Sequence, residues 1–144
     1  MEENDTIRLL KECDAGTKMA VSSIDEVLEK VHAEKFKNLL RESKSHHEEL
    51  GNEIHSLLME KGSKDKEPSP MAKGMSWLKT NVKIGMDSSD ATIADLITDG
   101  CNMGVKCLFK YLNQYKAADK ISRDICHRLV AIEDELTVDL RGYL

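Results

Sequence analysis

The sequence predicts an all-α fold, a four-helix bundle with a long connection between its second and third helices. Apolar residues recur at steps of three and four over four long stretches, which is the period of a helix packed on one face. Only 4% of the residues are aromatic and only two are proline, so strand-forming and helix-breaking residues are scarce. The pattern Cys-x-x-Gly-x-Lys occurs twice, 88 positions apart, as two copies of one helical hairpin would show.

The first expected helix spans residues 5–31. Its apolar or small positions follow steps of three and four along the whole stretch. Asn4 or Asp5 is placed to cap its start, because a short polar side chain accepts hydrogen bonds from the free backbone N–H groups there. Asp14 and Thr17 are the polar residues on its otherwise apolar side, and both belong to the first copy of the repeated pattern.

The second expected helix spans residues 35–61, after a turn near residues 32–34 that a break in the apolar phase indicates. One continuous helix across both stretches would be about 85 Å long at ~1.5 Å per residue, which is too long for a compact domain. The apolar side of this second helix includes His46 or His47. Gly62 follows its last turn, where glycine commonly ends a helix.

A crossover of residues 62–89 follows. It begins with a polar linker that contains both prolines, residues 62–70, and residues 71–85 then predict a short amphipathic helix. This connection is long enough to travel the length of a bundle, so the two helices that it joins are expected to run in the same direction. The third helix is expected over 90–115, with a cap in the Asp-Ser-Ser-Asp run at 87–90. The fourth is expected over 119–143, with a wholly apolar or aromatic side.

The two copies of the repeated pattern begin at Cys13 and Cys101, and at an offset of 86 the second helix also aligns with the fourth. Gly16 and Gly104 fall inside expected helices, where each glycine costs about 1 kcal/mol relative to alanine. A helix keeps such a glycine where another backbone comes close. We therefore expect the pattern to mark a two-fold-related crossing of the first and third helices; the alternative is chance recurrence of six residues.

The second residue of the pattern is Asp14 in one copy and Asn102 in the other. A buried carboxylate needs hydrogen-bond partners, and two carboxylates at a two-fold contact would repel one another. We expect Asp14 to bond with Asn102 across the two-fold, or with Thr17 or Asn52.

The formal net charge of −5 argues against nucleic acid as a partner, because binding to phosphates requires a basic surface. Residues 61–86 differ: six lysines and two acidic residues give a local charge of +4, which leaves −9 for the rest. No stretch approaches the length of a membrane span, so no membrane insertion is expected. The acidic start lacks the pattern of a signal peptide. We expect a cytoplasmic protein whose four cysteines are reduced and buried.

The layout of four helices, a long crossover and two similar hairpins resembles the ferritin-like superfamily, which includes rubrerythrin. More narrowly, residues 75–108 are similar to uncharacterised bacterial ferritin-like families, and they read MSWLKTNVKIGMDSSDATIADLITDGCNMGVKCL. In those families a tryptophan-bearing crossover helix leads into a glycine-bearing third helix. The resemblance implies, for metal-binding members, a Glu on two helices and Glu-x-x-His on the other two, all facing inward.

This chain departs from that metal-binding pattern. Its second helix has Ser43-x-x-His46, with the histidine but without the glutamate. The repeat carries those two positions to Leu129 and Ile132 on the fourth helix, and neither residue can bind a metal. A complete di-iron site is therefore not expected.

A second group of ligand-type residues is expected near the turn at residue 117. Cys107 should face Cys126 or His127 there. In an antiparallel hairpin, two residues at the same level have residue numbers whose sum is about twice the number of the residue at the turn. Thiols beside an imidazole suggest a labile disulfide or a Cu(I) or Zn(II) site; the alternative is two reduced core cysteines beside an exposed histidine. The candidate ligands for Fe, Zn or Cu are Asp14, His46, His47, Asp99, Cys107, Cys126 and His127.

Two functions are consistent with these features. The preferred one is a non-enzymatic bundle that has lost the metal site, needs no cofactor, and acts by self-association or by binding a protein partner. The alternative is a divergent metal-binding protein. The sequence contains no nucleophile–base pair, no phosphate-binding glycine loop and no pair of catalytic carboxylates. The two hypotheses differ in whether polar residues converge at the centre of the bundle.

Overall fold

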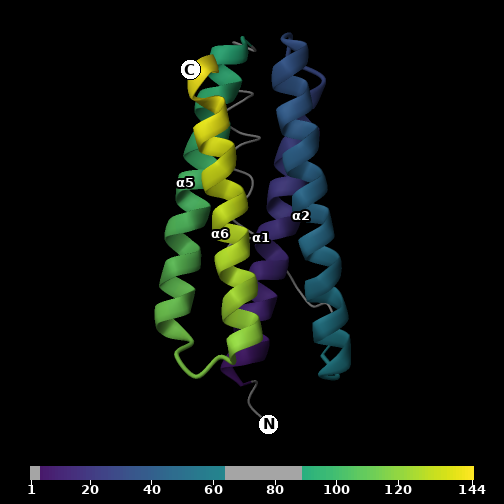
Figure 1. Cartoon of the computed structure of the whole chain (residues 1–144), viewed down its shortest axis with the longest axis vertical. Coiled ribbons are helices and arrows are strands. Elements are labelled where there is room, and N and C mark those ends of the chain that lie inside the picture. The colour runs from purple at the N-terminus through teal and green to yellow at the C-terminus, as the bar shows by residue number, and fades with distance from the viewer. Residues whose placement is uncertain (1–3, 64–88) are drawn as a thin grey trace.

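The computed structural model of the chain describes residues 4–63 and 89–144. Their helices lie side by side in one elongated bundle (Figure 1), which confirms the prediction of an all-α four-helix fold. The expected short helix over 71–85 lies outside the described residues. None of the described helices combines the length and apolar composition that crossing a membrane requires. The elements are α1 (Asp5–Leu28), α2 (Glu34–Glu60), α5 (Asp90–Gln114), α6 (Lys120–Leu140) and the 3₁₀ turn η1 (Arg141–Tyr143).

Two sets of hydrogen bonds fix the directions of the helices. The carboxylate of Asp90, at the start of α5, accepts from the backbone N–H groups of His32 and Ala33 at 2.7 and 2.9 Å, so α5 begins beside the turn between α1 and α2. At the other end of the bundle the N–H of Asp119 donates to Thr6 Oγ1 at 2.8 Å, which joins the starts of α6 and α1. Consequently α2 and α5 run in one direction and α1 and α6 in the other (Figure 1).

The helix ends follow local chemistry where the sequence offers it. Asn4 caps α1, since its Oδ1 accepts from the N–H of Ile7 at 2.9 Å. Ser89 caps α5, since its Oγ accepts from the N–H of Thr92 at 3.2 Å. After α2, Gly62 has a φ of 72°, a conformation that glycine adopts without steric cost.

Two expected helix ends were placed too late. α1 ends at Leu28 and not at residue 31, because Val31 is buried within the following turn and so continues the apolar pattern beyond the helix. The fourth helix ends at Leu140, and the 3₁₀ turn η1 then carries Tyr143 back onto the bundle, where its ring stacks on Phe36.

The core consists of two apolar clusters, one toward each end of the bundle. The cluster beside the α5–α6 turn includes Leu9, Leu50 and Leu129. The cluster beside the α1–α2 turn includes Phe36 and Leu136. Along each helix, a stretch between the two clusters contributes to neither, and buried polar side chains occupy this middle level.

Asp90 is expected to stabilise the end of the bundle that it joins. Its burial raises its pKa, but the two backbone donors outweigh this and the net shift is downward. Replacing Asp90 with alanine leaves the N–H groups of His32 and Ala33 without their acceptor, and should lower the free energy of unfolding by about 1–2 kcal/mol. Urea unfolding followed by circular dichroism measures this. Asp95→Ala, an exposed change on the same helix, should cost less than about 0.5 kcal/mol; equal losses would contradict the assignment.

A buried polar centre

Buried polar side chains from three helices meet at the middle level of the bundle. Thr17 comes from α1, Ser43 and His47 from α2, and Glu133 from α6. The His47 side chain is 1% exposed and the Glu133 side chain 9%. α5 contributes Gly104 at this level. The feature that separates the two functional hypotheses, convergence of polar residues at the centre, is therefore present.

His47 is held in one tautomer by its own helix. Its Nδ1 lies 2.8 Å from the backbone carbonyl oxygen of Ser43, which only accepts hydrogen bonds, so Nδ1 carries the proton and donates. Burial lowers the pKa of His47, and this outweighs the raising effect of the Ser43 carbonyl. The ring is therefore neutral near pH 7, and Nε2 keeps a free lone pair. That Nε2 atom is buried and has no hydrogen-bond partner among the described residues.

Glu133 faces His47 across the centre of the bundle. Its Oε1 lies 3.9 Å from His47 Nε2, which is longer than a hydrogen bond, and its Oε2 is buried without a partner among the described residues. Burial raises the pKa of Glu133 to about 8, and nearby Asp134 and Cys126 add to the rise. The distance would permit an ion pair, yet both pKa shifts oppose one. Near pH 7 the pair is an uncharged acid beside an uncharged imidazole.

Gly104 makes room for the Glu133 carboxyl group. A Cβ atom placed at Gly104 would lie 2.5 Å from Oε2 and 3.0 Å from Oε1 of Glu133. The nearest neighbour of this glycine is a side-chain carboxyl group and not the backbone that we expected there. The repeated pattern thus marks a place in α5 where a polar group from α6 enters the centre. The expected crossing of α1 and α5 at Gly16 and Gly104 stays a prediction.

A cavity lies between α1 and α5, and its polar lining side chains include His47, Glu133 and Ser23. It encloses about 40 Å³, and about 530 Å³ when its open side is counted. Most of its lining is apolar or glycine, which is typical of a small-molecule site with a few placed polar groups. The other lining residues are Gly16, Met19, Ala20, Ile24, Ile97, Gly100, Cys101, Gly104, Leu108 and Leu136.

Asp14 finds its partner within its own helix. Its Oδ2 accepts from Lys18 Nζ at 2.8 Å, and Thr17 Oγ1 donates to the backbone carbonyl of Asp14 at 2.8 Å. Asn102 is exposed on α5, so the expected pair across a two-fold was wrong. A lysine one turn further along α1 satisfies the carboxylate, which the comparison of the two pattern copies alone did not reveal.

The thiols also pair differently from the expectation. The Cys126 Sγ donates to the backbone carbonyl oxygen of Leu108 at 3.8 Å, and the nearby Cys126 thiol raises the pKa of Cys13 on α1. His127, one residue further along α6, is exposed and contacts the ring of Phe109 edge-on. Matching residue numbers across a turn compares only residues of one hairpin. It therefore could not identify the proximity of Cys13 on α1 to Cys126 on α6. All four cysteines are free thiols.

Of the seven candidate ligands, only His47 lines the central cavity. His46 is half-buried in a shallow depression between α2 and α6, and Asp99 is exposed. In the part of the chain that the structure describes, no three His, Cys, Asp or Glu side chains are arranged to hold one metal ion. The di-iron set that the resemblance implies does not fit these residues, because the centre offers one imidazole and one carboxyl group.

Glu133 is the central residue that the sequence prediction missed. The offset of 86 that aligns Leu50 with Leu136 carries His46 to Ile132 but carries His47 to Glu133. Placing the histidine position at His47 would have identified the second polar residue of the site. Because a step of one residue turns a helix by about 100°, the choice between the two histidines decides which partner is found.

Comparison of the chain with protein-family models, with curated proteins and with solved structures gives no match in any of the three.

Proposed function

We propose that this chain is a divergent ferritin-like bundle that works as a binding protein and holds one small molecule at its centre. The observation that carries the proposal is that His47 Nε2 and Glu133 Oε2 are both buried without partners and belong to one cavity. A buried polar group without a partner costs roughly 1–3 kcal/mol, so a ligand that satisfies both groups recovers this loss. The parallel course of α2 and α5 supports the ferritin-like layout.

The chemistry of the cavity selects the ligand class. Nε2 of His47 accepts a hydrogen bond, and the protonated carboxyl group of Glu133 donates one. A hydroxyl group matches this pair, because it donates through its hydrogen and accepts through its oxygen. An anionic ligand would meet no lysine or arginine among the described residues that line the cavity, and it would lose its hydration. We therefore assign a small, mostly apolar alcohol or phenol to the site, with its hydroxyl group in the enclosed space of about 40 Å³ and its carbon part in the open side of the cavity.

A single divalent cation is the second candidate. The tautomer of His47 favours it, since metal-binding histidines usually donate their other ring N–H to a carbonyl or carboxylate. A cation would also ionise Glu133. Two protein ligands, however, are fewer than the three or four of most zinc sites. The small-molecule proposal needs no further ligand and is preferred for that reason.

The test uses 4-fluorophenol as the probe, with fluorine NMR to follow binding near pH 6.5, where Glu133 is protonated. Fluorobenzene, which lacks the hydroxyl group, is the matched control. The phenol should bind at least about tenfold more tightly, because one hydrogen bond to a buried polar group contributes about 1.4 kcal/mol. Gly104→Ala should weaken binding of the phenol by displacing the Glu133 carboxyl group, whereas Gly142→Ala, where a Cβ meets open space, should not.

Equal binding of both probes, or no binding of either, would refute the assignment. Metal content of tag-free protein, measured by mass spectrometry after purification under reducing conditions, separates the second candidate. About one Fe, Zn or Cu per chain, lost in His47→Ala, would replace the small molecule by a cation.

A further inference from the structure

The outer side of α5 combines lysines with exposed apolar side chains. Residues 100–118 contain three lysines and no acidic residue, in a chain whose net charge is −5. Met103 is 50% exposed and Phe109 is 44% exposed. We call this surface the basic face; it consists of Met103, Lys106, Phe109 and Lys110 on α5, and of Lys116 in the turn that follows α5.

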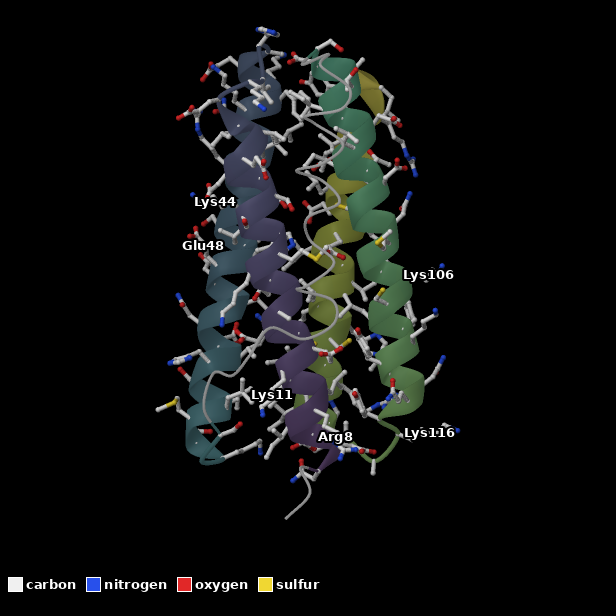
Figure 2. All side chains as sticks on the ribbon, turned by 180° about the vertical axis from the view of Figure 1, so that it is seen from behind. Arg8, Lys11, Lys44, Glu48, Lys106 and Lys116 are labelled. Atoms are coloured by element: carbon white, nitrogen blue, oxygen red, sulfur yellow. The ribbon has the colours of Figure 1, made fainter. Side chains whose placement is uncertain are left out.

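The basic face has no charge partner among the residues that the structure describes in its own copy. Lys106, Lys110 and Lys116 are exposed, and none of them forms an ion pair with any described residue. Figure 2 shows Lys106 and Lys116 directed away from the bundle. Exposed apolar side chains with charged residues around them are typical of a surface that another molecule covers.

A groove of opposite charge lies between α2 and α6. It measures about 670 Å³, and the side chain of Ile121 in it is 59% exposed. Four carboxylates line it, against one arginine, Arg128, which binds Glu53 through two hydrogen bonds of 2.6 and 3.0 Å. Glu49 and Glu60 have no ion pair among the described residues. We call this surface the acidic groove; it consists of Glu49, Glu53, Glu60, Ile121 and Asp124.

We propose that the basic face of one copy of this chain docks in the acidic groove of a second copy. Arg128 pairs with Glu53 and Lys120 pairs with Asp124 at 2.7 Å, so the groove offers the two uncompensated carboxylates of Glu49 and Glu60 to the three lysines. Exposed apolar side chains lie on both surfaces. Within one copy they do not meet, because α5 and α2 lie on opposite sides of the bundle (Figure 1). A contact between two different surfaces is head-to-tail, so its repetition forms rings or open chains and not a closed two-fold dimer.

This contact depends on charge and should therefore depend on salt. Its ion pairs lie at an exposed surface, where the Debye length is about 10 Å at ~0.1 M salt and about 3 Å at ~1 M. Complementary charges mainly accelerate and orient association, so we expect a reversible complex of modest affinity. This inference does not depend on the central cavity or on any ligand in it.

Charge reversal on each surface tests the pairing directly. Sedimentation velocity of the wild type at ~50 mM salt should give an average mass above the 16.2 kDa of one chain, falling toward it at ~500 mM. The double variant Lys106→Glu, Lys110→Glu should be monomeric, and so should Glu49→Lys, Glu60→Lys. A mixture of these two variants should associate again, because the reversed surfaces complement one another. The matched control Lys30→Glu, Lys35→Glu changes exposed lysines near the α1–α2 turn and should behave as the wild type.

Three results would overturn the pairing. The first is a wild type that stays monomeric at low salt. If such a monomer bound phosphatidylglycerol vesicles through its basic face, the partner would be a membrane surface and not a second copy. The second is a mixture of the two variants that does not associate. The third is association that survives either reversal. Circular dichroism of each variant excludes loss of fold as the cause of a monomeric result.

Discussion

Glu133→Gln is expected to make the protein more stable at pH 8 and to remove most of its pH dependence between about pH 6.5 and 8. The pKa of Glu133 rises from 4.5 to about 8 on folding because the carboxyl group is buried. Between these two values the folded chain binds one proton more than the unfolded chain. Its free energy of unfolding therefore falls as the pH rises, by about 1.4 kcal/mol per unit, and the loss is complete above pH 8. The whole loss is at most roughly 5 kcal/mol.

The window near pH 6.5 to 8 isolates this effect from that of His47. Burial lowers the pKa of His47, so the unfolded chain takes up a proton at this residue first as the pH falls below 6.5. Stability consequently decreases toward acid through His47, while it increases toward acid through Glu133, and the two effects oppose one another below pH 6.5. Above pH 6.5, of these two residues, only Glu133 makes the free energy of unfolding depend on pH.

Urea unfolding of the wild type and of Glu133→Gln across this window, followed by circular dichroism, measures the difference in slope. Titrations common to both proteins cancel in that difference. Glu135→Gln is the matched control, since Glu135 is exposed on the same helix, and its slope should equal that of the wild type. If Glu133→Gln keeps the wild-type slope, the carboxyl group is ionised in the folded state, and it cannot donate a hydrogen bond to a ligand near pH 7.

The periodicity of the sequence was sufficient to predict the four helices. Each helix must bury one apolar side, so the spacing of leucine and isoleucine fixes its extent to within a few residues. Local chemistry at Asn4, Ser89 and Gly62 then sets three of the ends. Val31 shows where this reasoning fails, since a buried residue in a turn continues the apolar pattern without continuing the helix.

The centre could not be predicted in the same way, because it depends on contacts between helices that are distant in the sequence. The choice of His46 in place of His47 led to Ile132 in place of Glu133. Asp14 also had several polar residues within reach on neighbouring helices, and the one that binds it, Lys18, lies on its own helix. Periodicity gives the side of a helix on which a residue lies, but the partner across the core depends on the rotation and level of every helix.

Phe36→Ala is expected to lower the free energy of unfolding by about 3–5 kcal/mol. Phe36 is fully buried in the cluster beside the α1–α2 turn, so its removal loses apolar contacts and leaves a cavity. The chain has two phenylalanines, and the other, Phe109, is 44% exposed. Phe109→Ala is therefore the matched control and should cost less than about 1.5 kcal/mol, including its edge-on contact with His127. Urea unfolding at ~500 mM salt, where self-association is suppressed, compares them.

The stack of Phe36 on Tyr143 separates two parts of that loss. The ring centroids are 4.8 Å apart with an interplanar angle of 26°, and Tyr143 lies in η1 after α6 has ended. A double-mutant cycle of Phe36→Ala with Tyr143→Ala should give a coupling of about 0.5–1.5 kcal/mol, the range found for aromatic pairs. A coupling near zero would mean that η1 does not pack against α2 in solution. The whole cost of Phe36→Ala would then come from the lost core contacts and the cavity that is left. The residues after Leu140 would in that case add nothing to the stability of the bundle through this contact.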